Sequence, residues 1–159
     1  MRFINLSNSN KQAIVDAEDF DRLSKKNWCL IQRKNDRVDI MSWGAGKSIY
    51  IGREVLNYSG EMEVDHINRD TLDNRKQNLR FATKSQNQQN SISRKGSSSK
   101  FKGVYFRKDT GRWQAHITIN YKKINLGCYP TEELAALAYN AAAIKYHDPV
   151  FVRLNEVPL

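Results

Sequence analysis

The sequence predicts an α+β protein with two small domains joined by a basic linker. Three observations support this prediction: short stretches in which apolar and polar residues alternate, one long helical pattern near the C-terminus, and a run rich in serine and cationic residues ahead of the last third. A chain of 159 residues is long enough for one ordinary domain or for two small ones with thin cores. We expect a first domain at 1–92, a flexible linker at 93–100 and a second domain at 101–159.

The part of the chain before residue 61 is expected to form short strands and one helix. Phe20 and Leu23 should face inward from the helix, and Trp28 has the character of a core residue. The run Gly46-Lys47-Ser48 suggests a phosphate-binding loop, but that motif needs a glycine where Met41 stands and a helix after it. A hairpin turn explains the glycines, so we expect no nucleotide cofactor. The predicted elements are a strand end at 13–16, a helix at 18–26, and strands at 37–41 and 48–51 around a turn at 44–47.

The segment 61–90 follows the order strand, loop, strand, helix. In the second strand, alternation places Leu79, Phe81 and Thr83 on one face, and Ser85 is expected to cap the helix. The predicted elements are a strand that begins at 61 and ends at His66, turn-forming residues from 68 to 74, a strand from 79 to 83 and a helix that begins at Gln86.

Four residues of this segment have side chains suited to hydrolytic chemistry. Asp65 and Asn87 offer hard oxygen ligands for Mg²⁺ or Mn²⁺, leaving positions for water and a phosphate oxygen. His66 is the candidate base, and a carbonyl of Asn78 would hold its imidazole in the useful tautomer. An Asp-His pair at a strand end is also typical of an ordinary solvated turn. We expect turn or capping roles, and no metal contact, for three further asparagines, Asn68, Asn74 and Asn90.

The segment resembles the HNH nuclease motif, the ββα-metal fold, in the variant whose last two motif positions are asparagine. The matching stretches are Asp65-His66, Asp73-Asn74-Arg75, Gln77-Asn78-Leu79-Arg80 and Ser85-Gln86-Asn87, within a core at about 61–92. Similarity to HNH homing endonucleases implies that Asp65 and Asn87 are metal ligands, that His66 is the general base and that Asn78 orients it. Some relatives have histidine where this chain has Asn87.

The charge of the chain favours a polyanionic partner. The formal net charge is +9, and it is unevenly placed: residues 91–125 hold 9 Lys+Arg against 1 Asp+Glu, a net of +8. Neutralising phosphates releases counterions, so this charge predicts a polyanionic partner, and the HNH resemblance implies that the partner is double-stranded DNA. The basic block alternates like strands instead of forming an amphipathic helix, which argues against a membrane surface.

Two distant cysteines, Cys29 and Cys128, favour neither a disulfide nor an all-cysteine zinc site. The start of the chain has no apolar signal region, and no run is long enough for a membrane span. We therefore expect an intracellular protein.

The C-terminal third is expected to form a three-stranded antiparallel sheet packed on one helix. Trp113, Ala115, Ile117 and Ile119 fall on one face of the middle strand, with polar residues on the other. Turns are expected at 108–111 and 120–122. Thr131 is the predicted N-cap of the helix, whose inward stripe is predicted to comprise Leu134, Leu137, Ala138, Ala141 and Ala142. The polar face of the sheet is left to meet DNA.

Residues from about 100 to 155 resemble the plant ethylene-response-factor (AP2/ERF) type of DNA-binding domain. The resemblance lies in Gly103-Val104, Gly111-Arg112-Trp113, Ala115, Leu126-Gly127, Thr131, the helix Ala135-Ala136-Leu137-Ala138-Tyr139 and Leu154-Asn155. It implies DNA contacts at Lys102, Tyr105, Arg107, His116, Thr118, Lys123 and Asn125, to which the linker adds Arg94 and Lys95. Only Lys102, Arg107 and Lys123 keep the basic character of the plant factors, so their base preference is not carried over.

Together these features predict a homing-type DNA endonuclease from a phage or mobile element, acting in the cytoplasm of a bacterial host as a monomer or weak dimer. One active site per chain predicts nicking. The main alternative is a sequence-specific DNA-binding regulator whose HNH motif is inactive. A third and weaker alternative is RNA binding, for which the sequence has no stacking motif of the expected kind.

Overall fold

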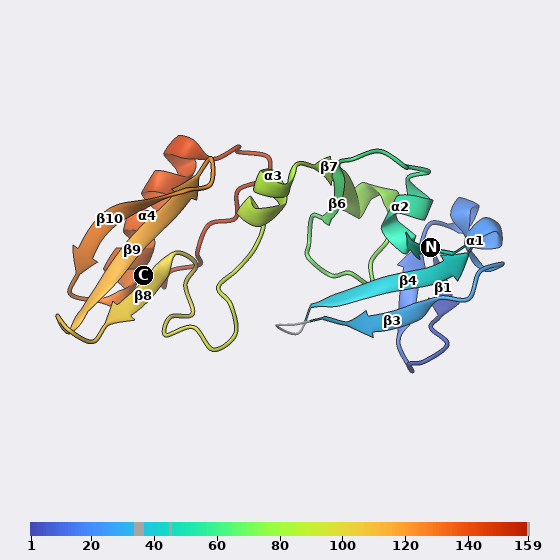
Figure 1. Ribbon diagram of the computed structural model, residues 1–159, viewed down its shortest axis with the longest axis horizontal. Helices are drawn as coiled ribbons and strands as arrows, with labels where there is room; N and C mark the ends of the chain where they lie inside the picture. Colours follow the sequence, from blue (N-terminus) through green and yellow to red (C-terminus); the bar gives the residue numbers. More distant parts are fainter. Residues whose placement is uncertain (34–36, 45, 159) are drawn as a thin grey trace. The chain divides into compact units, whose positions relative to one another are not determined.

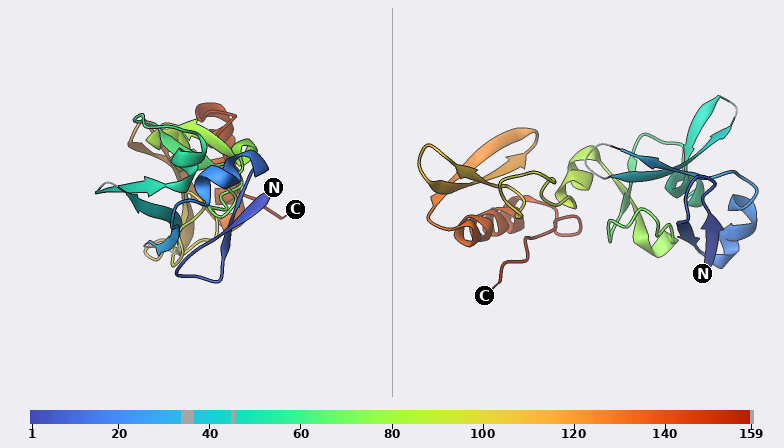
Figure 2. Two further views of the ribbon diagram at one scale, coloured as in Figure 1. Left: turned by 90° about the vertical axis from the view of Figure 1, so that its right-hand side faces the viewer. Right: turned by 90° about the horizontal axis from the view of Figure 1, so that it is seen from below.

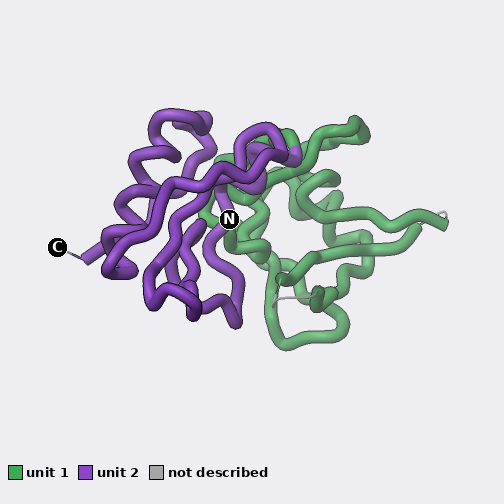
Figure 3. The backbone as a smooth tube through the Cα atoms, turned by 60° about the vertical axis from the view of Figure 1, so that its left-hand side comes forward, with its two compact units in different colours: residues 1–83 green, residues 84–159 purple. Residues whose placement is uncertain are grey.

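The computed structural model describes residues 1–33, 37–44 and 46–158. The chain forms two compact units, residues 1–83 and residues 84–159 (Figure 3). Both contain antiparallel strands and helices, which confirms the α+β class. The functional domains 1–92 and 101–159 stay a prediction. Among the described residues, no helix has the length and apolar character needed to cross a bilayer.

The first unit is built from short antiparallel pairs around one core (Figure 1). Strand β1 (Arg2–Asn5) pairs with β2 (Gln12–Val15), and β4 (Val38–Gly44) lies between β3 (Cys29–Gln32) and β5 (Lys47–Tyr50). Strand β6 (Glu63–His66) pairs with β7 (Leu79–Ala82). The helices are α1 (Ala17–Leu23), α2 (Ile51–Val55) and a 3-10 turn, η2 (Lys76–Asn78).

Trp28 is the largest side chain in the centre of this unit, where it is 1% exposed. Its indole N–H donates to the carbonyl of Leu23 at 2.8 Å, which satisfies the one polar group of the ring. Leu23 is fully buried and Phe20 packs against the same core, so both helix residues face inward as predicted. Residues of β1, β2, α1 and α2 contribute to this core. Leu79 of β7 belongs to it and Val64 of β6 packs against it, so the core supports the β6–β7 pair.

Two predictions for this unit are wrong. Helix α2 follows β5 directly, where the sequence suggested strand up to residue 51 and no helix; Ile51 and Val55 are four positions apart and both buried, as a short helix requires. On β7 the buried residues are Leu79 and Ala82, whereas Phe81 is 41% exposed and Thr83 is exposed. The predicted strand is thus one residue too long, because the chain turns into a helix after Ala82, and the face that carries Leu79 and Phe81 is buried only at Leu79. Ala45 of the predicted hairpin turn lies outside the described residues.

The second unit contains α3 (Lys84–Gln89), a sheet in the order β10-β9-β8, and α4 (Glu132–Tyr146). The strands are β8 (Val104–Arg107), β9 (Arg112–Ile119) and β10 (Lys122–Tyr129), and α4 lies along one face of their sheet (Figures 1 and 2). This is the predicted arrangement. Helix α3 begins two residues earlier than predicted, so that Ser85 is inside it.

Helix α4 begins as predicted, but only part of the predicted inward stripe is buried: Ala142 is buried and Ala138 packs against the core, whereas Leu134, Leu137 and Ala141 are exposed. The Thr131 hydroxyl accepts a hydrogen bond from the backbone N–H of Leu134 at 3.2 Å. Leu134 and Leu137 are 46% and 50% exposed, and the buried residues are Ala135, Ala136, Tyr139, Ala142 and Ala143. Alanine allows the helix to lie closer to the sheet than leucine would, so the predicted inward positions of the leucines are wrong.

The end of the predicted linker is held by the second unit. Ser99 is buried and its hydroxyl donates to Glu132 at 2.6 Å, and the hydroxyl of Ser98 accepts from the N–H of Phe106 at 3.0 Å. The serines that suggested a flexible tether therefore act as hydrogen-bonding groups next to the sheet and α4.

Candidate functional site

Strands β6 and β7 place Asp65 and His66 at adjacent positions, opposite Arg80 and Leu79. Asp65 is 5% exposed, and its Oδ2 accepts from Nε of Arg80 at 2.8 Å and lies 2.7 Å from the terminal nitrogen Nη2 of the same side chain. A buried carboxylate is stable in its charged form only with such a partner. Arg80 therefore pairs with Asp65 and fixes the direction of its carboxylate. The sequence analysis named Arg80 only as part of the Gln77-Asn78-Leu79-Arg80 match and predicted no contact with Asp65.

The imidazole of His66 is oriented by Asn74. Oδ1 of Asn74 lies 3.0 Å from Nε2 of His66, and Nδ2 of Asn74 donates to the carbonyl of Thr71 at 2.9 Å. The contact with Thr71 fixes which end of the amide faces the ring. Because a carboxamide oxygen only accepts, Nε2 must carry the ring proton, and in the neutral ring the basic lone pair is then on Nδ1.

Burial lowers the pKa of His66 below its usual value, against the opposing effects of the Asn74 hydrogen bond and of three nearby carboxylates, Asp65, Asp70 and Asp73. A lower pKa means that the ring is neutral at physiological pH. A neutral imidazole can take a proton from water, whereas an imidazolium cannot. The environment therefore suits His66 to the role of general base.

Asn74 is held rigidly by the first unit. It is fully buried, and its N–H donates to the carbonyl of Ile14 on β2 at 2.8 Å, while the N–H of Ile14 donates to Leu72 at 2.7 Å. The loop after β6 is thus attached to β2. We predicted a turn or capping role for Asn74, and its contact with His66 has no signal in the sequence beyond its place in the Asp73-Asn74-Arg75 match.

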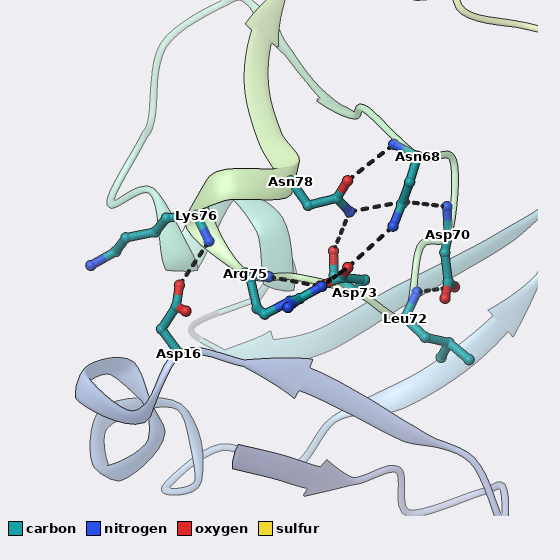
Figure 4. Close-up of polar contacts among 8 residues, drawn as sticks. All are labelled: Asp16, Asn68, Asp70, Leu72, Asp73, Arg75, Lys76 and Asn78. Atoms are coloured by element: carbon teal, nitrogen blue, oxygen red, sulfur yellow. Dashed lines mark hydrogen bonds and ion pairs between the residues drawn. The ribbon is translucent and has the colours of Figure 1, made fainter. Parts of the chain in front are cut away.

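Asn78 organises the loop between β6 and β7 (Figure 4). Its Oδ1 accepts from the N–H of Asn68 at 3.0 Å, and its Nδ2 donates to Oδ1 of Asn68 at 2.9 Å and to the carbonyl of Asp73 at 2.7 Å. Its backbone carbonyl accepts from the N–H of Ile67 at 2.9 Å, directly after His66. Asn78 therefore holds the backbone at Ile67 and Asn68, directly after His66, and positions the imidazole only indirectly. A direct orienting role stays a prediction.

Asp73 is the second fixed point of this loop (Figure 4). Arg75 donates to both carboxylate oxygens at 2.7 Å, which lowers the pKa of Asp73, and Asn68 donates to Oδ2 at 3.1 Å. The next residue, Lys76, donates its N–H to Asp16 at 2.8 Å. The charged residues around Asn74 and Asn78 therefore hold the loop in place, and with it the Asn74 amide that contacts His66.

The predicted metal ligands come from two elements of different units. Asp65 is the third residue of β6 in the first unit, and Asn87 is the fourth residue of α3 in the second. Within the described residues, no group of three or more histidine, cysteine, aspartate or glutamate side chains is arranged to hold a metal ion. An ionised carboxylate and a carboxamide fit a hard cation that takes its remaining ligands from water and phosphate. The ligand roles of Asp65 and Asn87 stay predictions.

Most of the predicted DNA contacts lie on the face of the sheet opposite α4. Register pairs Lys123 with Thr118 and Asn125 with His116 across β9 and β10. The ring of Tyr105 on β8 lies 5.6 Å from that of His116, and Nζ of Lys123 is 4.9 Å from the Tyr105 centroid. The sheet thus presents cationic, aromatic and amide groups together, a combination suited to phosphates and base edges.

Other members of the predicted set are engaged within the second unit. Arg107 forms an ion pair with Asp109, which raises the pKa of Arg107 and lowers that of Asp109. Nζ of Lys102 donates to the carbonyls of Gln88 and Gln89 at 2.7 and 2.8 Å, so its amine is directed at α3. From the predicted linker, Arg94 and Lys95 are exposed. DNA contacts at these residues stay predictions.

Burial of Lys102 makes the stability of the second unit depend on pH. Desolvation lowers the pKa of Lys102 to about 8 from its usual 10.5. Between these values the unfolded chain binds more protons than the folded one, so stability rises with pH. A neutral amine still has two N–H groups for its two carbonyl partners.

We expect the free energy of unfolding of the wild type to rise by about 1–2 kcal/mol relative to Lys102→Met between pH about 8 and about 9.5. Tyr139, whose pKa burial raises to about 12, acts in the opposite direction only above its usual value of 10. Urea unfolding at several pH values measures the difference. Parallel curves for the two proteins would contradict the expectation.

Comparison with known families agrees with the two parts of this description. Residues 58–89 match the family model described as HNH endonuclease, and residues 99–149 match the one described as AP2 domain. APETALA2-like protein 2 of Oryza sativa subsp. indica is 47% identical over 49 residues, which cover 31% of this chain and 11% of that protein. AP2-like ethylene-responsive transcription factor TOE2 of Arabidopsis thaliana is 45% identical over 49 residues, covering 31% and 10%.

The chain therefore spans about a tenth of the length of these curated relatives. No solved structure matches it. The two family matches lie one after the other, with the first covering Asp65 and His66 and the second covering the β8–β10 sheet and α4. The chain thus carries an HNH endonuclease-like segment followed by an AP2 domain.

Proposed function

We propose that this protein is a site-specific DNA endonuclease of the homing type, which nicks DNA by metal-dependent hydrolysis of a phosphodiester. The observation that carries the proposal is the environment of His66: a partly buried imidazole with a lowered pKa, oriented by Asn74, beside the carboxylate of Asp65 that Arg80 holds. A merely structural histidine needs no adjacent ionised carboxylate. This combination is the one that proton removal from water at a phosphate requires.

In the proposed reaction, Nδ1 of His66 accepts a proton from a water molecule whose oxygen attacks phosphorus. A new P–O bond to the water oxygen forms as the bond between phosphorus and the 3′ oxygen breaks. The 3′ oxygen takes a proton from solvent and becomes a 3′ hydroxyl, and the phosphate stays on the 5′ end of the nick. A divalent ion held by Asp65 and Asn87, when bound, would offset the negative charge that builds up on the phosphate. Asn74 keeps Nε2 of His66 protonated throughout.

The AP2 domain supplies affinity for double-stranded DNA in this proposal. Its open sheet face carries Lys123, Thr118 and Tyr105, and the chain as a whole has a net charge of +9. One active site per chain leads to a nick, and cutting both strands needs two binding events. We also propose the bacterial cytoplasm as the place of action, for a protein encoded by a phage or mobile element.

A DNA-binding regulator with an inactive motif is the second candidate. It is favoured by the curated relatives, one of which is described as a transcription factor, and by the ion pair that occupies Oδ2 of Asp65. Both candidates bind DNA, so binding alone does not separate them.

Metal removal separates the two candidates. Sites that the purified full-length protein binds are first selected from a random library and placed in a supercoiled plasmid. With Mg²⁺ or Mn²⁺, the endonuclease is expected to convert the plasmid to the open circle, and EDTA is expected to lower the rate to background, because oxygen-only sites hold these ions reversibly. Binding without nicking at any concentration of either ion would leave the regulator as the function.

A further inference from the structure

Helix α3 has little to stabilise it on its own. It comprises six residues, Lys84–Gln89, and none of them is buried. An isolated helix of this length is unstable in water, because each end leaves backbone groups without intrahelical partners. Its conformation must therefore be maintained by contacts with the rest of the second unit, to which it belongs.

Lys102 provides the first of these contacts, at the C-terminal end of α3. Its Nζ lies 2.7 Å from the carbonyl oxygen of Gln88 and 2.8 Å from that of Gln89. Carbonyls at a helix C-terminus carry partial negative charge and lack helical donors, so an ammonium group there satisfies both needs.

Asp148, just after α4, provides the second. Its Oδ2 accepts from Nε2 of Gln86 at 3.2 Å, and its N–H donates to Oε1 of Gln89 at 3.0 Å. The N–H of Arg153 adds a contact of 3.2 Å to the carbonyl of Gln89. Two side chains and two carbonyls of α3 are therefore held from two separate segments of the same unit.

Lys102 is itself anchored to α4. Its N–H donates to Oδ1 of Asn155 at 2.8 Å, and Nδ2 of Asn155 donates back to the Lys102 carbonyl at 3.1 Å. Asn155 exchanges two further hydrogen bonds with Asn140 of α4, at 2.8 and 2.9 Å. A continuous path of hydrogen bonds thus connects the long helix of the AP2 domain with α3.

We propose that Lys102 and Asp148 are positioning residues for the nuclease, which hold α3 and thereby orient Asn87. This inference rests on the proposed function, since it assigns Asn87 to the metal. It gives the AP2 domain a second task besides binding DNA. Asn87 lies between Gln86 and Gln88, so both ends of the segment that carries it are fixed by this domain. It also gives Lys102 a role different from the DNA contact that its sequence position implies.

The test compares Lys102→Met and Asp148→Ala with Lys108→Met in the full-length protein. Lys108 is exposed in the turn between β8 and β9, so its replacement removes the same charge from the same unit. Three quantities are measured: the Mn²⁺ concentration that gives half-maximal single-turnover nicking, the dissociation constant for DNA with its salt dependence, and amide hydrogen exchange across α3. Lys102→Arg, which keeps a cationic donor, serves as the rescue variant.

We expect Lys102→Met to raise the half-maximal Mn²⁺ concentration about tenfold or more, as loss of outer-shell support does at metal sites. Exchange in α3 should become faster, and Lys102→Arg should restore both properties in part. Asp148→Ala should act in the same direction, and it decides the question if Lys102→Met fails to fold. DNA affinity should change no more than in Lys108→Met.

Weaker DNA binding with a smaller salt slope, together with an unchanged Mn²⁺ requirement and unchanged exchange in α3, would make Lys102 a phosphate contact and overturn the inference. That result leaves the proposed function intact. Absence of nicking by the wild type would instead remove the proposed function, and with it the catalytic part of the inference. Hydrogen exchange would still show whether Lys102 holds α3.

Discussion

Replacing His66 with alanine is expected to lower the nicking rate by about 10²–10⁴-fold while DNA binding is retained. The physical reason is that His66 is the neutral, oriented imidazole beside Asp65, and alanine leaves no group that can accept the proton of the attacking water. The rate is measured in single turnover with protein in excess, so that affinity does not enter. Binding to the same DNA is measured in the presence of EDTA.

His116→Ala is the matched control, because it removes the same side chain from the sheet of the AP2 domain. His116 pairs with Asn125 and contacts the Tyr105 ring, and none of these residues belongs to the HNH segment. We expect this variant to weaken binding and to leave single-turnover nicking at saturation unchanged. Equal loss of nicking and binding in His66→Ala would instead indicate that the imidazole supports the fold of the first unit.

Replacing Gly103 with alanine is expected to destabilise the second unit by about 3–5 kcal/mol, which combines left-handed backbone strain with overpacking. Gly103 has φ +76°, and a Cβ there would lie 2.2 Å from Cδ2 of Tyr139 and 2.5 Å from the backbone oxygen of His116. Neither neighbour can move easily, since Tyr139 is a buried residue of α4 and the oxygen belongs to β9. A loss of this size is a large part of the stability of a small domain.

Gly111→Ala separates the two causes. Gly111 also has a positive φ, +64°, but no atom lies within 4 Å of the position that its Cβ would take. It should therefore show backbone strain alone, about 1 kcal/mol. The free energy of unfolding of both variants is measured by urea unfolding of the full-length chain, and hydrogen exchange of β9 amides shows whether the loss lies in the second unit. Equal destabilisation by the two substitutions would show that the close contact between the sheet and α4 at Gly103 adds nothing to the backbone strain.

The β6–β7 pair shows how far local pattern extends. Alternating residues and turn formers predicted a strand ending at His66, a loop and a second strand starting at Leu79, and the structure confirms them. Residue type also identified Asp65 and His66 as candidate site residues. Periodicity has no information on which loop side chain touches the imidazole, so the contact made by Asn74 was missed, as was the ion pair between Asp65 and Arg80.

The same limit applies to α4. Its N-cap at Thr131 is a local signal and was predicted, whereas its buried stripe was predicted only in part. Leucine outranks alanine in apolar character, which favoured Leu134 and Leu137 as core residues. Close approach to Gly103 decides otherwise, because only small side chains and the flat ring of Tyr139 fit between helix and sheet.

The sequence by itself determined the α+β class, the meander followed by one helix, and the residues with chemistry to offer around Asp65 and His66. These are local properties, set by side-chain alternation, turn-forming residues and residue type. Only the tertiary structure decided that Asn74 orients His66, that Arg80 faces Asp65 and that Lys102 points at α3. Each of these contacts joins residues brought together by loop closure and packing, and buried polar groups then select whichever partner lies within hydrogen-bonding distance.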